Sequence, residues 1–197
     1  MKLSTLFKKQ RKIIMGTVLI FLVIALVGTF VQPLKYRVQA KVLVVQEFSP
    51  EADPFTVSRL NEYLSTLLAN VVQSESFFQQ ALSTGFNFDN NYFSGTRKQQ
   101  LRKWEKTVEA SAIYDTGLIT ISVYHPDAEQ AEQLTQAIIK TLATKNSFYH
   151  SIQNVEVRII DSPTTSRFPV RPNIALNVLV GLILGLAVGI ALASKKI

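Results

Sequence analysis

Two long apolar stretches lie near the ends of the chain, one over residues 13–31 and the other over residues 174–193, and neither contains a charged residue. At 1.5 Å of rise per residue, a helix of about 20 residues spans roughly 30 Å, the thickness of the hydrocarbon core of a bilayer. A helix also satisfies its own backbone hydrogen bonds in that environment. The pattern therefore predicts two transmembrane helices.

Each stretch has a simpler interpretation. The first could be a cleaved signal peptide because basic residues precede it, but its apolar core is longer than is usual and Val27-Gly28-Thr29-Phe30 is a poor cleavage site. The second could be a buried core helix, but its length and the basic pair Lys195-Lys196 directly after it argue against that. We therefore expect two uncleaved membrane anchors.

Between the two stretches the pattern alternates between the strand period and the helix period. Polar and apolar residues alternate over residues 36–45, as in a half-covered strand. Asp53-Pro54 carries the features of a helix start, with leucines at helical spacing after it, and Ser74-Glu75 begins a second helix that Gly85 is expected to end. Residues 87–95 are expected to form a polar loop with aromatic residues.

The second half of this region adds a helix, a hairpin, a further helix and a strand. A basic helix is expected over residues 96–106, and the turn residues Asp115-Thr116-Gly117 join two alternating segments into a hairpin. His125-Pro126-Asp127 begins the next helix, and residues 155–160 form the last strand. Because strands and helices alternate without a regular βαβ rhythm, the pattern predicts an α+β domain between two transmembrane helices.

Charge predicts the orientation. Residues 32–173 contain 14 basic and 14 acidic residues, so the whole net charge of +7 lies on the two ends of the chain. Basic residues beside membrane helices stay in the cytoplasm. We expect cytoplasmic tails at residues 1–12 and 194–197 and an outer domain at residues 32–173, and we interpret the basic pI as a topology signal and not as a sign of nucleic-acid binding. The basic residues of the tails are Lys2, Lys8, Lys9, Arg11, Lys12, Lys195 and Lys196.

The sequence gives little support for catalysis. There is no cysteine, and the two histidines, His125 and His150, are expected at opposite ends of one helix, about 37 Å apart at 1.5 Å per residue. We expect His125 to cap that helix and His150 to end it. No phosphate loop or nucleophile motif is present, and no pair of acids stands out. We therefore predict no catalytic, cofactor or metal residues, and a membrane-bound hydrolase is disfavoured.

Three groups of residues remain as candidates for function. Lys98, Arg102 and Lys106 share one helix face, which is either a solvated surface, the simpler interpretation, or a contact for an anionic glycan, a lipid headgroup or a pyrophosphate carrier. Two further groups lie at and near the second membrane helix: Gly181, Gly185 and Gly189, whose spacing favours close helix packing, and Pro163, Pro169 and Pro172, which are expected to make residues 162–172 a rigid membrane-proximal segment.

Taken together, these features resemble the Wzz-type chain length determinants, also called polysaccharide co-polymerases. The resemblance rests on a basic tail and first helix followed by residues 36–40, the helical segment over residues 60–76, and the hairpin that leads into residues 126–131. It rests further on the strand at residues 155–161 and, most specifically, on the proline segment joined to the glycine-rich second membrane helix.

The resemblance implies a function that composition alone does not. It implies a non-enzymatic regulator of the length or export of a surface polysaccharide, either O-antigen or capsule and exopolysaccharide, in the bacterial inner membrane. The implied partners are further copies of the chain in a ring, a Wzy-type polymerase and its lipid-linked polysaccharide. The chain lacks room for the long helical hairpin of many members, so it resembles a short form.

Two alternative functions stay open from the sequence. Short forms often act as adaptors for a cytoplasmic tyrosine kinase through a tail, although residues 194–197 do not resemble that activator. A sensor or scaffold outside the cytoplasm, unrelated to glycans, is the other alternative. The sequence names neither the sugar nor its length.

Overall fold

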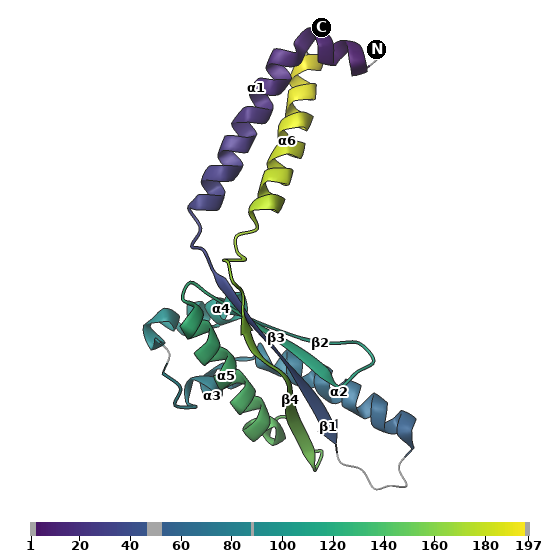
Figure 1. The fold of residues 1–197 in the computed structure, drawn as a ribbon, viewed down its shortest axis with the longest axis vertical. Coiled ribbons are helices and arrows are strands. Elements are labelled where there is room, and N and C mark those ends of the chain that lie inside the picture. Colours follow the sequence, from purple (N-terminus) through teal and green to yellow (C-terminus); the bar gives the residue numbers. More distant parts are fainter. Residues whose placement is uncertain (1–2, 47–52, 88, 196–197) are drawn as a thin grey trace. The chain divides into compact units, whose positions relative to one another are not determined.

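The computed structural model describes residues 3–46, 53–87 and 89–195, so Lys2 and Lys196 of the expected tails lie outside the described residues (Figure 1). The chain divides into two compact units. The first unit joins residues 1–34 to residues 170–197, and the second comprises residues 35–169.

The first unit is a pair of helices, α1 (Leu3–Phe30) and α6 (Ile174–Ser194). By length and composition, Gln10–Phe30 and Ile174–Ser194 are long and apolar enough to cross a membrane. The backbone of α1 leaves helical geometry at Gln10, within the basic N-terminal part of the helix. The two apolar stretches are thus helical, as the pattern predicts.

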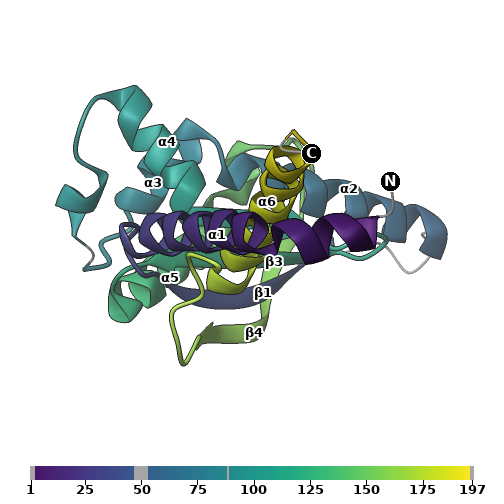
Figure 2. The same cartoon turned by 90° about the horizontal axis from the view of Figure 1, so that it is seen from above.

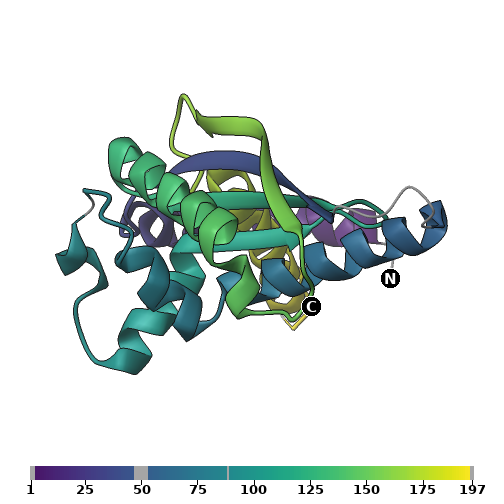
Figure 3. The ribbon, with the colours of Figure 1, turned by 90° about the horizontal axis from the view of Figure 1, so that it is seen from below.

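The second unit is built on one four-stranded sheet. Its strands are β1 (Tyr36–Gln46), β2 (Val108–Ala112), β3 (Leu118–His125) and β4 (Val155–Thr165), and their order across the sheet is β2-β3-β1-β4. All neighbours pair antiparallel. In Figure 2 the strands β3, β1 and β4 follow one another, and Figure 3 shows β4 at the edge away from α3 and α4. The α+β prediction is confirmed.

One face of this sheet is covered by α2 (Pro54–Val72), α4 (Arg97–Thr107) and α5 (Ala128–Lys145), and α3 (Glu75–Leu82) packs against these three helices. Alternate strand residues point into the core, where they meet the apolar faces of the helices. The other face of the sheet carries the intervening, partly exposed residues. Among the fully buried side chains are Val38, Val42, Ile119, Ile121, Leu64, Leu68, Phe77, Phe78, Trp104, Leu134, Ile138 and Leu142.

Side-chain caps explain where the helices begin. Asp53 accepts a hydrogen bond from the backbone N–H of Thr56, and Ser74 accepts one from that of Phe77, so both predicted helix starts are confirmed. The helix after β3 is capped by Asp127. The prediction that His125 caps this helix is therefore wrong. The carboxylate of Asp127 satisfies two orphan donors, whereas His125 is still part of the strand.

Other boundaries also differ from the prediction. The expected loop at residues 87–95 contains a short 3-10 helix, Asn90–Phe93, whose Phe93 is buried in the core. The helix α5 ends at Lys145 and a second 3-10 helix follows at Asn146–Phe148, so His150 lies beyond the helix that it was expected to end.

The last strand is longer than predicted because it is bulged. Residues Gln39 and Lys41 of β1 face Thr164 and Asp161 of β4, so two steps along one strand match three along the other. A second shift follows between Lys41 and Val42. These irregularities accommodate Pro163, which lacks a backbone donor, and they let the strand continue to Thr165.

Candidate functional site

The three glycines of α6 all face α1. Gly181, Gly185 and Gly189 are buried, whereas most of the neighbouring residues of α6 are exposed. A Cβ atom built on Gly181 would lie 2.9 Å from the Cβ atom of Ala25, and one on Gly185 would lie 2.7 Å from the Cα atom of Val18. The two helix backbones therefore approach so closely that a larger side chain at these positions requires them to move apart.

Polar side chains join the same two helices. The hydroxyl of Thr17 donates to the carbonyl oxygens of Ile14 at 2.8 Å and of Gly185 at 3.3 Å. The amide of Asn177 donates to the hydroxyl of Thr29 at 3.0 Å. Hydrogen bonds between helices in an apolar environment are typically worth about 0.6 kcal/mol each. These hydrogen bonds help to fix the orientation of α1 against α6, in addition to the close packing at the glycines.

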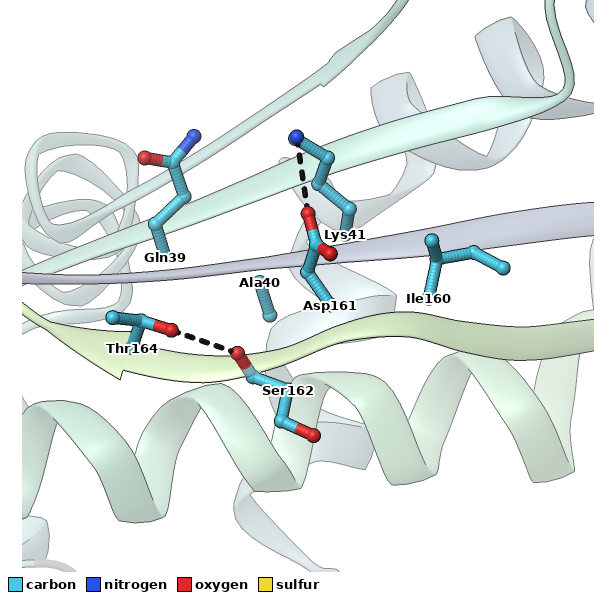
Figure 4. Close-up of a pocket in the computed structure, with 7 residues that line it drawn as sticks. All are labelled: Gln39, Ala40, Lys41, Ile160, Asp161, Ser162 and Thr164. Carbon is cyan, nitrogen blue, oxygen red and sulfur yellow. Dashed lines mark hydrogen bonds and ion pairs between the residues drawn. The ribbon is translucent and has the colours of Figure 1, made fainter.

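A groove opens on the uncovered face of the sheet, at the bulge between β1 and β4 (Figure 4). It has a volume of about 360 Å³ and is lined by Gln39, Ala40, Lys41, Ile160, Asp161, Ser162 and Thr164. The Nζ atom of Lys41 lies 3.0 Å from a carboxylate oxygen of Asp161, and both side chains are partly exposed. Figure 4 shows the side chains of Gln39, Lys41 and Asp161 extending to the same side of the sheet.

The polar character of this groove continues across the sheet. Cross-strand pairing places Ser122 opposite Gln39 and Thr120 opposite Lys41, and Glu109 and Ser111 of β2 follow in the same two rows. These side chains offer hydroxyl, amide and charged groups at the spacing of strands. The surface can hydrogen-bond a ligand that is rich in hydroxyl groups. The alternation of residues 36–45 indicated an uncovered strand face, but it could not show which strand would lie beside it.

The predicted basic face of α4 is exposed in the structure. Lys98, Arg102 and Lys106 all lie on the surface, and within the described residues none of them forms an ion pair. Their neighbour Arg97 pairs with Glu75, and this hydrogen bond raises the pKa of the guanidinium. Lys103 lies over the ring of Tyr92, with its Nζ atom 3.9 Å from the centroid. Solvated surface and anion contact both remain open for the three exposed side chains.

The two histidines occupy separate environments. The Nδ1 atom of His125 accepts a hydrogen bond from the backbone N–H of Asp127 at 3.1 Å, and its ring contacts the ring of Tyr92. Burial lowers the pKa of His125 below its ordinary value of 6.5, and the nearby Lys35 and Lys103 lower it further. His150 lies instead on the loop after α5. Within the described residues, no cluster of three or more metal-ligating side chains occurs.

The three prolines fall into two settings. Pro163 lies inside β4, paired through its neighbours with β1, so part of the expected rigid segment is sheet. Pro169 and Pro172 follow after the end of that strand and before α6. The first four residues of the segment 162–172, which is predicted to be rigid, thus belong to a strand that pairs with β1.

Comparison with known protein families found two matches. Residues 1–84 match the model of the Wzz chain length determinant protein, and residues 126–196 match the GNVR model, which describes a G-rich domain on tyrosine kinases. Together the matches leave out residues 85–125 and the last residue. No curated protein matches the chain significantly.

Proposed function

Because this chain belongs to the Wzz-type chain length determinant family, we propose that it regulates the chain length or export of a bacterial surface polysaccharide. The observation that carries the proposal is the pair of family matches, in the expected order, over the two ends of the chain. The regulator needs no catalytic centre, because its effect on chain length would come from binding and assembly. O-antigen and capsule or exopolysaccharide are the classes of glycan that it would act on.

The proposed setting is the bacterial inner membrane. In it, Gln10–Phe30 and Ile174–Ser194 are the spans, and residues 32–173 lie on the periplasmic or extracellular side. The concentration of positive charge at the two ends of the chain supports this orientation, with the flanking residues 1–12 and 194–197 in the cytoplasm.

The proposed partners are further copies of the chain in a ring, a Wzy-type polymerase and the lipid-linked polysaccharide. The groove and the polar rows beside it supply hydrogen-bonding groups that suit sugar hydroxyls. A heterologous interface between neighbouring copies would close into a ring. A protein that remains monomeric in both mild detergent and lipid nanodiscs would contradict the ring.

A second candidate function rests on the match to the G-rich domain described on tyrosine kinases. In that case the chain would act as a membrane adaptor for a separate cytoplasmic kinase. Deleting the gene would then change tyrosine phosphorylation of that kinase, and the kinase would co-purify with the chain. Normal phosphorylation together with altered polysaccharide length would exclude the adaptor role.

The decisive experiment is deletion of the gene, followed by sizing of surface and lipid-linked polysaccharide on gels. We expect a lost or shifted length distribution, restored by the wild-type gene and not by Gly185→Leu, whose new side chain meets α1. Gly28→Leu is the matched control, since a Cβ atom at Gly28 meets nothing within 4 Å, and it should restore the distribution.

Expression of each variant must be checked in the membrane fraction. An unchanged distribution after deletion would overturn the proposal and leave a sensor or scaffold unrelated to glycans. A shifted distribution that Gly185→Leu restores fully would keep the function but remove the packed helix pair from its mechanism.

A further inference from the structure

Four basic residues lie at one end of the second unit. They come from the start of β1, from α4 and from the segment after β4, and they meet because β1 begins where β3 and β4 end. We call this group the basic collar, and its members are Lys35, Arg37, Lys103 and Arg167.

Contacts around His125 bring the two lysines together. Lys103 lies over the ring of Tyr92, whose centroid is 4.2 Å from that of His125. His125 is the cross-strand partner of Tyr36, the residue next to Lys35. Both lysines also contribute to lowering the pKa of this imidazole, in agreement with the contacts.

Backbone contacts bring the two arginines together. The N–H of Ser166 donates to the carbonyl oxygen of Arg37 at 2.8 Å, and the N–H of Arg37 donates to the hydroxyl of Ser166 at 3.0 Å. Arg167 therefore follows directly after a residue that is held against Arg37. Its guanidinium lies over the exposed ring of Phe168.

The collar carries uncompensated positive charge. Within the described residues, none of its four members pairs with a carboxylate, whereas Lys41 in the middle of the sheet pairs with Asp161. The acids at this end include Asp89, Asp127 and Glu129, and the carboxylates of Asp89 and Asp127 accept backbone hydrogen bonds as helix caps. A cationic surface without internal counter-ions attracts an external anion.

Covalent connection fixes which anion can reach it. Lys35 is five residues after Phe30, the last residue of α1, and Arg167 is seven residues before Ile174, the first residue of α6. A chain of five to seven residues spans at most about 18–25 Å even when fully extended. The collar thus cannot leave the neighbourhood of the helix ends, whatever the orientation of the second unit.

From this placement we propose that the basic collar binds the phosphate groups of anionic lipids in the membrane leaflet beside the outer ends of α1 and α6. The proposal rests on the proposed membrane insertion of these helices. The positive-inside rule disfavours basic residues at the outer ends of membrane helices. The presence of the collar residues near these ends therefore needs another explanation, such as binding of an anion. Arginine and lysine together suit phosphate, since the guanidinium binds it in two places and the ammonium as a point charge.

The test uses the full chain in nanodiscs that contain phosphatidylcholine with spin-labelled phosphatidylglycerol or spin-labelled phosphatidylcholine. Electron paramagnetic resonance measures the fraction of each labelled lipid held at the protein. We expect the wild type to prefer the anionic lipid, and a variant with Lys35, Arg37, Lys103 and Arg167 all changed to glutamine to lose at least fivefold of that preference. One basic group near an anionic surface is worth about fivefold in association.

The matched control carries the same exchange at Arg59, Lys140 and Lys145, which lie on α2 and α5 away from the collar, and it should keep the wild-type preference. Basic residues of the N-terminal tail are common to all variants and cancel in the comparison. Thermal unfolding shows whether each variant is folded. If the fourfold variant does not fold, the lipid measurement is repeated with the single variant Arg167→Gln.

Three results would overturn the proposal. The first is equal retention of the two lipids by the wild type, and the second is an equal loss of preference in the collar and control variants. The third is displacement of labelled phosphatidylglycerol by millimolar inorganic pyrophosphate, which would assign the collar to a soluble anion. Because no polysaccharide is measured, failure here leaves the proposed function standing, whereas a chain that does not insert into nanodiscs removes the basis of both.

Discussion

At the scale of single residues, the core depends on a polar contact that the sequence does not reveal. Trp104 is fully buried, and its Nε1–H donates to the backbone carbonyl of Val72 at 2.8 Å. This carbonyl lies at the end of α2, where helical carbonyls lack partners of their own. The indole thus closes the helix end while its ring packs against Phe78 and Phe93.

We expect Trp104→Phe to lower the free energy of unfolding by about 2–4 kcal/mol. The exchange leaves the carbonyl of Val72 buried without a donor and a space where the larger ring was. Chemical denaturation followed by circular dichroism measures the change. Tyr114→Phe is the control, because Tyr114 is 87% exposed and its exchange should alter stability little. Equal effects of the two variants would contradict the role of the indole hydrogen bond.

His125 should make the stability of the protein depend on pH. Its folded pKa is lowered from 6.5, mainly by burial and further by Lys35 and Lys103, while Asp127 opposes the shift. The unfolded chain therefore binds a proton more readily, so stability is complete above about pH 6.5 and falls as the pH drops towards the folded pKa.

Thermal unfolding of the full chain in nanodiscs at pH 7.5 and pH 5.0 measures this dependence. The drop in Tm between the two values should be smaller in His125→Gln than in the wild type. The same exchange at His150 shows how losing a histidine elsewhere affects the drop. If His125→Gln leaves the drop in Tm between the two pH values unchanged, His125 is not the source of the pH dependence.

At the scale of elements, the α1–α6 pair is set by the absence of side chains on one face. Gly185→Leu should push the helices apart by about 2 Å, because interaxial distance follows the size of the contacting residues. Spin labels on cysteines introduced at the exposed positions Val23 and Leu184 measure the separation by double electron–electron resonance. Gly28→Leu should leave the distance unchanged, and widening in both variants would contradict the model of a local contact.

The elements also show how far the sequence alone can lead. Local signals were sufficient for the helix starts at Asp53 and Ser74 and for the hairpin around residues 115–117, because caps and turns involve neighbours in the chain. The groove could not be predicted, since it depends on β1 and β4 meeting across more than 100 residues. The burial of Phe93 was missed for the same reason.

At the scale of the whole molecule, the absence of cysteine offers a direct test of topology. Ser58→Cys on α2 and Ser194→Cys at the end of α6 each place one exposed thiol on the chain. A membrane-impermeant maleimide added to spheroplasts should label the first and not the second, and both after lysis. Labelling of the second in intact spheroplasts would contradict a cytoplasmic C-terminus.

The pairing of β1 with β4 has a mechanical consequence. One strand continues into α1 and the other into α6, so the two helices are joined to the same end of a single ladder. A lateral force that separated the helices would load the hydrogen bonds between Arg37 and Ser166 first, then the pair Val38–Thr165, and then each following pair in turn. Peeling breaks bonds one at a time and so needs little force, whereas pulling both helices in one direction loads no bond between the strands.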